Sequence, residues 1–325
     1  MNPYSIFQNH GEEQFNRLCL DVFKHQFEHI GIYREFAQYL RKSPDQVNHY
    51  TEIPFLPIEL FKSHQIMSAQ NLPEIVFKSS GTTGMDRSQH FVADIQLYEE
   101  SFMKAFELFY GPVQDFVILA LLPSYVENGD SSLVYMADQL IQLSQQKESG
   151  FYLNNYDKLT EQIQLLKTSS KKIILLGVSY ALLDITEMGQ IDFPELIVME
   201  TGGMKGRRKE MVREELHEYL RAGFGVDKIH SEYGMTELLS QAYSRGDGVF
   251  QYPPWMKILI RDTNDPLSLM PEGKSGAINV IDLANYHSAS FIATQDLGKI
   301  IGKNQFEILG RFDHSDVRGC NLLIA

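Results

Sequence analysis

The chain has 325 residues, of which 43% are apolar and 22% charged, a composition typical of a globular protein with a substantial core. This length allows two domains or one large one. The net charge of −13 argues against nucleic acid as the main partner, because phosphate backbones are bound through a surplus of lysine and arginine.

The sequence carries no signal for secretion or membrane insertion. The first residues, MNPYSIFQNHGEEQ, lack the basic and apolar regions of a signal peptide, and no apolar run is long enough to span a membrane. The two cysteines, Cys19 and Cys320, suggest neither a disulfide framework nor a zinc site. We therefore expect a cytoplasmic protein.

The chain begins with an expected helical region. Apolar residues at helical spacing predict an amphipathic helix over 12–29, with Cys19 packed as a small hydrophobe on its apolar side, and a second helix over 33–41. The segment 53–62 then reads IPFLPIELFK. Its two prolines, three residues apart, predict an extended segment docked on the body of the protein.

Strands and helices alternate through the middle of the chain. Asp94 is expected to cap a helix ending near Phe109. The other expected helices cover 131–146 and 206–221, and the expected strands cover 89–93, 116–122, 171–178, 196–199 and 228–230. This alternation predicts an α/β fold with a largely parallel sheet.

The pattern changes near residue 250. Short strands are expected at 256–261, 277–281, 290–294 and 305–309, with no long helix between them. We therefore divide the chain into an α/β nucleotide- and acyl-binding region, 1–249, and a β-rich subdomain, 250–325.

A loop rich in glycine, serine and threonine follows the apolar strand expected at 75–77. Residues 78–87 read KSSGTTGMDR, in which Gly81 and Gly84 allow positive φ and close approach of the backbone to a ligand. Exposed N–H groups and hydroxyls of this kind bind phosphate or another anion. The Walker A pattern is absent, and by itself the segment is equally compatible with a surface turn.

Four further polar segments accompany this loop: ETGG at 200–203, SEYGMTE at 231–237, TQDLG at 294–298 and LGRFD at 309–313. Ligands of open α/β sheets bind beyond the carboxyl ends of the strands, where such segments are expected.

Together these segments resemble the adenylate-forming superfamily of acyl- and aryl-CoA ligases, adenylation domains and luciferase-type enzymes. The chain most resembles the acyl-protein synthetases, or long-chain-fatty-acid–luciferin-component ligases, of bacterial bioluminescence systems. IPFLPIELFK, KSSGTTG, SEYGMTEL, TQDLG and the terminal Arg318-Gly319-Cys320 carry this resemblance, which covers nearly the whole chain. The pattern is also similar to phenylacetate-CoA ligases.

The resemblance implies a fold and a set of ligands. The fold is a large α/β domain with mainly parallel sheets flanked by helices, followed by a β-rich subdomain. Most relatives continue into a C-terminal lid domain, which is expected to be absent here. The implied cofactors are ATP and Mg²⁺. The implied partners are a carboxylic acid and an acyl-acceptor protein such as a fatty-acyl reductase.

The resemblance also implies roles for individual residues. Glu237 would hold Mg²⁺, and Thr236 would contact the α-phosphate. Arg87 would meet phosphate, Arg311 would reach the ribose or the developing charge, and Cys320 would carry the acyl group. The remaining nucleotide-binding residues would be Ser79, Ser80, Gly81, Thr82, Thr83 and Gly84 at the phosphates, Gly202, Gly203 and Tyr233 at the adenine, Asp296 at the ribose, and Gly234.

The implied reaction is ATP-dependent activation of an acid, expected to be a fatty acid, to an acyl-adenylate that a protein thiol attacks. Alternatives are an acyl- or aryl-CoA ligase of the phenylacetate type and a catalytically idle nucleotide-binding subunit. Individual residues also have structural interpretations. Tyr233 and Thr236 could pack at a strand end, Asp296 could be a turn residue, and Arg311 could form a surface ion pair. His230 could be a base, a substrate ligand or a core histidine.

Overall fold

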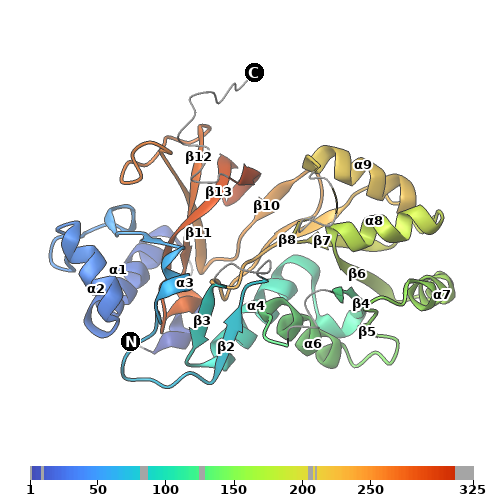
Figure 1. Cartoon of the computed structure of the whole chain (residues 1–325), viewed down its shortest axis with the longest axis horizontal. Coiled ribbons are helices and arrows are strands. Elements are labelled where there is room, and N and C mark those ends of the chain that lie inside the picture. The colour runs from blue at the N-terminus through green and yellow to red at the C-terminus, as the bar shows by residue number, and fades with distance from the viewer. Residues whose placement is uncertain are drawn as a thin grey trace.

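The computed structural model describes residues 2–8, 11–80, 87–123, 129–203, 208 and 211–311. Within these residues, a 12-stranded sheet runs in the order β11-β12-β13-β14-β10-β9-β8-β7-β6-β4-β5, with β1 paired to β13 (Figure 1). No helix of the described ranges is long and apolar enough to cross a membrane.

One half of the sheet is parallel and lies between two layers of helices (Figure 1). Its strands are β4 (Phe116–Leu121), β5 (Gly150–Phe151), β6 (Lys172–Val178), β7 (Ile197–Thr201) and β8 (His230–Tyr233). Every residue of β4 is buried, as a continuous apolar run predicts for a strand covered on both faces. The helices are α4 (Ile95–Tyr110) and α6 (Ser132–Ser144) on one face, α8 (Ser179–Met188) and α9 (Arg213–Phe224) on the other, and α7 (Tyr156–Leu166) beyond the edge.

The other half of the sheet is antiparallel, which confirms the predicted β-rich C-terminal part. Its strands are β9 (Ala242–Ser244), β10 (Val249–Gln251), β14 (Gln305–Arg311), β13 (Phe291–Gly302), β12 (Ser275–Asp282) and β11 (Met256–Arg261). Because β10 pairs with both β9 and β14, the sheet continues without interruption through residue 250. A domain boundary at this position stays a prediction.

Two N-terminal helices pack on the antiparallel half (Figure 1). They are α1 (Glu12–His29) and α2 (Gly31–Tyr39). The Phe23 ring contacts Phe291 edge-on at 6.4 Å, and Gln26 Nε2 donates to the carbonyl of Asn285 at 2.9 Å. Short 3₁₀ helices lie at Pro3–Gln8, Tyr50–Glu52, Val113–Asp115 and Leu283–Asn285.

The IPFLPIELFK segment is only partly extended. Its residues Leu56–Pro57 form β1, which pairs in parallel with β13, and Leu60–Ser63 form the short helix α3. Next along the chain, β2 (Ile75–Lys78) and β3 (Gln89–Val92) form a separate antiparallel pair. This pair brackets the glycine-rich loop.

The structure also differs from the predicted elements at other places in the chain. Helix α9 begins at Arg213 rather than 206, since Val212 has extended backbone angles and Glu214 and Glu215 favour the N-terminal turn. The strand predicted at 228–230 is observed at His230–Tyr233. Helices α7 and α8 were not predicted.

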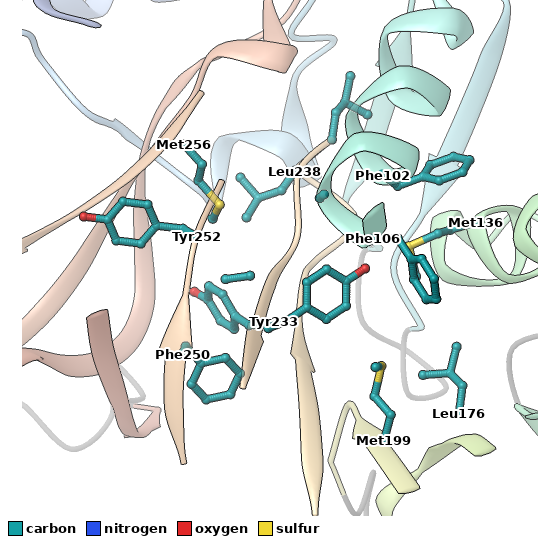
Figure 2. Close-up of a cluster of buried hydrophobic side chains, with 14 of the residues drawn as sticks. Phe102, Phe106, Met136, Leu176, Met199, Tyr233, Leu238, Phe250, Tyr252 and Met256 are labelled. Carbon is teal, nitrogen blue, oxygen red and sulfur yellow. The ribbon is translucent and has the colours of Figure 1, made fainter. Parts of the chain in front are cut away.

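Buried apolar side chains fill the space beneath α4 and α6. Figure 2 shows Phe102 and Phe106 of α4 and Met136 of α6 on the same side as Leu176 of β6 and Met199 of β7. All five are at most 3% exposed. These five side chains lie beside β8, and we refer to them as the apolar wall.

Candidate active site

The β2–β3 pair closes the base of the glycine-rich loop. Ser79 N donates to Ser88 O at 3.0 Å, and Ser88 N donates to Ser79 Oγ at 2.9 Å. Ser80 is exposed at the last described position before the loop. The remaining predicted phosphate ligands, Gly81, Thr82, Thr83 and Gly84, lie outside the described residues.

Arg87 follows this loop in the chain and contacts Ser79, which precedes the loop. Its guanidinium pairs with Asp130, with 2.7 Å between Nη2 and Oδ1, and its Nε donates to the carbonyl of Ser79. Lys78 Nζ lies 3.6 Å from Asp130 Oδ2. An incoming phosphate would therefore share Arg87 with Asp130.

His90 joins the β2–β3 pair to the SEYGMTE segment. Its Nδ1 lies 2.9 Å from Thr236 O, and its Nε2 lies 2.8 Å from Ser288 Oγ. Burial lowers the pKa of His90 to about 4, partly offset by the bond to Thr236, so the ring is neutral. A carbonyl only accepts, so Nδ1 carries the proton and Nε2 accepts from Ser288.

Glu237 lies directly beside this contact and is 6% exposed. The pKa of its carboxyl is raised on balance, because the effect of burial exceeds the lowering by a hydrogen bond with Ser88 and by the charge of Arg311. Ser88 therefore connects the base of the glycine-rich loop to the one acidic residue that was predicted to hold the metal.

The residues after Glu237 are fixed by two buried side chains that the sequence reasoning missed. Asp282 Oδ2 accepts from Leu239 N at 2.8 Å, and Asn285 Nδ2 donates to Glu237 O at 2.7 Å. Asp282 follows a predicted strand and also caps the next 3₁₀ helix, which is a recognisable local signal.

The TQDLG and LGR segments meet the SEYGMTE segment at Asp296. Tyr233 OH donates to Asp296 Oδ2 at 2.8 Å, and Arg311 is the partner of Asp296 in the β13–β14 ladder. Burial raises the pKa of Asp296, whereas the Tyr233 hydroxyl and the positive charges of Arg311 and Arg261 lower it. The buried carboxylate of Asp296, the hydroxyl of Tyr233 and the exposed guanidinium of Arg311 are therefore close together.

The IPFLPIELFK segment reaches the same point. Gln295 Nε2 donates to Glu59 Oε1 at 2.8 Å, and Gln295 Oε1 accepts from Arg311 Nη2 at 3.1 Å. Gln295 thereby connects Glu59 to the guanidinium predicted to face the nucleotide. The sequence reasoning assigned no role to Glu59 or Gln295.

The ring of Tyr233, predicted to stack on adenine, is only 8% exposed. It packs edge-on against Phe250 at 6.1 Å and Phe306 at 5.7 Å. Its hydroxyl positions Asp296, so the stacking role stays a prediction.

The ETGG segment lies alongside β8. Gly202 has φ 69°, in the left-handed region that favours glycine, and both Gly202 and Gly203 are exposed beyond the end of β7. Ser179 Oγ donates to Gly202 O at 3.3 Å, and Thr201 Oγ1 donates to the carboxylate of Glu232. A flat ligand could approach the exposed glycine backbone here.

The pKa values of two buried carboxyls on neighbouring strands, Glu200 and Glu232, are shifted in opposite directions. Burial opposes ionisation of Glu200, but His217, 3.5 Å from its Oε1, and Arg213 lower the net pKa of Glu200 below its usual value. Among the residues that the structure describes, no such cation acts on Glu232. Burial and the Glu200 charge outweigh the Thr201 hydrogen bond and raise the pKa of Glu232 to about 7.

The remaining candidates are placed as follows. Cys320 lies outside the described residues, and Cys19 is fully buried, which raises the pKa of its thiol well above the usual value. His230 packs against Tyr110, whose hydroxyl is 3.1 Å from its Nδ1, as a core histidine would. Across the described ranges, no three His, Cys, Asp or Glu side chains form a metal cluster.

Comparison with known proteins identifies the family of the chain. The family model "Acyl-protein synthetase, LuxE" matches residues 1–325. A long-chain-fatty-acid–luciferin-component ligase of Photorhabdus luminescens is 34% identical over 85 residues, which are 26% of this chain and 72% of that protein.

Similar solved structures share the fold at low sequence identity. ATP-bound MatB from Rhodopseudomonas palustris is 18% identical, with a TM-score of 0.54 over 73% of this chain, which spans only 47% of MatB. A 2-hydroxyisobutyryl-CoA ligase in complex with 2-HIB-AMP and CoA is 14% identical, with a TM-score of 0.64 over 94% of this chain and 70% of that one. The chain belongs to the LuxE family of acyl-protein synthetases, ATP-dependent acid–thiol ligases with an adenylate-forming fold.

Proposed function

We propose that this protein uses ATP and Mg²⁺ to convert a fatty acid into an acyl-adenylate and then transfers the acyl group to a protein thiol. The observation that carries the proposal is the 2.8 Å hydrogen bond between Tyr233 and Asp296, beside Arg311. It joins segments that are more than 60 residues apart in the chain. Such convergence is expected of a nucleotide site and not of isolated turns.

The side chains at this point suit the parts of ATP. Asp296 would accept hydrogen bonds from the ribose hydroxyls, and Thr236 would contact the α-phosphate. The loop 79–84 would receive the other phosphates through backbone N–H groups.

The donor set also fits Mg²⁺. Magnesium is commonly bound by one or two carboxylates together with substrate phosphates and waters, so Glu237 alone is a sufficient protein ligand. The ion would neutralise phosphate charge when bound. The buried carboxylate would hold it close to the Ser88 end of the phosphate loop.

The reaction then follows from positioning and charge. A carboxylate oxygen of the acid attacks the α-phosphorus, and the bond to the bridging oxygen of pyrophosphate breaks. Arg311, held by Gln295, would stabilise the negative charge that develops on the phosphate oxygens. A thiolate next attacks the acyl carbonyl carbon, and AMP leaves with the bonding electron pair.

Cys320 is the proposed thiol of this chain. It lies nine positions after Arg311, and that length of chain spans at most about 32 Å when extended. Arg318 would raise the thiolate fraction by lowering the pKa of the thiol. The acyl group could then pass to a partner such as a fatty-acyl reductase.

Two assays test the proposal. Acid-dependent exchange of pyrophosphate into ATP, measured against a panel of carboxylic acids, tests adenylation. A single-turnover competition between CoA and protein thiol then identifies the acceptor. ATP binding without exchange for any acid would instead indicate an idle nucleotide-binding subunit.

A further inference from the structure

Three polar side chains lie together on the face of β8 and β9 beneath helix α4. Glu232 of β8 is directly opposite Tyr243 of β9, so their side chains are neighbours on one face. A β-carbon placed on Gly234 would lie 2.4 Å from Glu232 Oε1 and 3.4 Å from Gln241 Cγ. Glu232, Gln241 and Tyr243 therefore form one cluster, which we call the polar cluster.

The polar cluster is buried but incompletely hydrogen-bonded. Gln241 is 3% and Tyr243 2% exposed, yet neither Gln241 Oε1 nor Tyr243 OH has a hydrogen-bond partner among the residues that the structure describes. Buried polar atoms in native proteins nearly always have partners, so two unpaired atoms on side chains of this cluster require an explanation such as a bound ligand.

The surroundings combine this polar end with apolar surface. Thr201 Oγ1 binds the Glu232 carboxylate, and Met199 is on the same face of β7, two residues earlier. Met199 belongs to the apolar wall that Figure 2 shows beneath α4 and α6. Tyr110 of α4 contacts the Tyr243 ring edge-on at 5.5 Å.

The polar cluster is also close in sequence to the proposed adenylation residues. Glu232 directly precedes Tyr233 and lies four residues before Thr236, the proposed α-phosphate contact. Thr201, which binds Glu232, directly precedes the exposed Gly202. An acid whose carboxylate reaches the α-phosphate would therefore place its first carbons beside the polar cluster and its tail along the apolar wall.

We propose that Glu232, Gln241 and Tyr243 form a hydrogen-bonding subsite of the acid-binding site, and that the acid carries a hydrogen-bond donor near its carboxyl end. This inference rests on the proposed adenylation function and specifies its substrate class. The donor is a hydroxyl or amino group, because the unpaired Gln241 oxygen can only accept. Tyr243 can accept or donate.

Burial of Glu232 raises its pKa to about 7, so its carboxyl can take either protonation state near neutral pH. The neutral acid can hydrogen-bond a hydroxyl, and the carboxylate can pair with an ammonium group. The polar cluster can therefore bind either a hydroxyl or an ammonium group, and an experiment must distinguish the two.

The test compares acids of equal chain length in the pyrophosphate exchange assay. The probes are a saturated fatty acid and its α- and β-hydroxy and α- and β-amino derivatives. We expect kcat/KM at least about tenfold higher for one hydroxylated or aminated acid, since a site built for a hydrogen bond rejects the analogue that lacks it. Whether the hydroxy or the amino derivative is preferred identifies the donor.

Two variants assign this preference to the polar cluster. Gln241→Leu and Tyr243→Phe should remove most of the discrimination by lowering kcat/KM for the donor-bearing acid toward the value for the unsubstituted acid. Tyr33→Phe is the matched control, because it removes a buried hydroxyl that is bonded to the carbonyl of Pro54, away from this face. It should leave the discrimination unchanged.

Stability measurements keep the test independent of turnover. Without acid, Tyr243→Phe should unfold at the wild-type temperature or above, because its hydroxyl is unpaired. The wild type and Tyr33→Phe should then be stabilised more by the donor-bearing acid than by the plain one, and Tyr243→Phe should not.

Equal kcat/KM for plain and donor-bearing acids in the wild type would overturn the inference while leaving the proposed function intact. Absence of exchange with every acid would overturn the proposed function and the inference together.

Discussion

Replacing Glu232 by glutamine should stabilise the protein in a pH-dependent way. The Glu232 carboxyl is 8% exposed, and its pKa is raised from 4.5 to about 7, chiefly by burial and further by the Glu200 charge, against the Thr201 hydrogen bond. Glutamine has the same shape as the protonated acid and can still accept from Thr201. It removes only the cost of burying a negative charge.

The sign follows from proton linkage. The folded state holds this proton more tightly than the unfolded state, so the contribution to stability is fully present below pH 4.5 and lost as the pH rises through about 7. A shift of this size corresponds to a loss of about 3 kcal/mol. Glu232→Gln should therefore match the wild type near pH 4.5 and exceed it by up to about 3 kcal/mol at pH 8.

Denaturant unfolding at pH 4.5, 6 and 8 measures this difference. Glu200→Gln is the matched control, because the pKa of Glu200 is lowered on balance and its ionised form stabilises the fold. That variant should lose stability at pH 8 and lose less on acidification. A Glu232→Gln protein that is less stable than the wild type at pH 8, or a difference that is independent of pH, would refute the reasoning.

Three further predictions concern the proposed reaction. Glu237→Gln should lower Mg²⁺-dependent exchange by orders of magnitude with an unfolding temperature no lower than that of the wild type, and wild-type exchange would remove the metal assignment. Cys320→Ala should keep exchange but lose hydroxylamine-labile acyl labelling; labelling that persists would place the acyl group elsewhere, for example on Cys19. Gln295→Leu should lower the exchange rate about tenfold through the freed Arg311, more in kcat than in the KM for ATP, and an unchanged kcat would show that Arg311 needs no such support.

Local sequence signals identified much of the fold. Asp94 was predicted to cap a helix, and its carboxylate accepts from Gln96 N and Leu97 N. Helix α8 was missed because it is short and buried on nearly every side, which leaves no polar face to mark a helical period. Strand β13 extends to Gly302, well past the predicted 294, because its pairing with β14 is a tertiary interaction that local patterns do not encode.

Local sequence signals likewise identified only some of the residues of the candidate site. Motif residues such as Asp296 were identified because turns rich in glycine and polar residues follow apolar strands. Their supporting partners were not, because His90 and Glu59 reach the site only through contacts that span well over a hundred residues. Gln241 could not be distinguished from an ordinary surface residue, since burial of a polar side chain depends on the packed structure.

The most direct test of the central claim is acid-dependent ATP–pyrophosphate exchange by the purified chain, with ATP and 2′,3′-dideoxy-ATP, in the wild type and in Asp296→Ala. The proposed site predicts exchange that requires a carboxylic acid, and a KM for ATP that rises in Asp296→Ala far more than the KM for the dideoxy nucleotide. Exchange that no acid supports, or equal effects of the substitution on both nucleotides, would contradict the assignment of this site to acyl-adenylate formation.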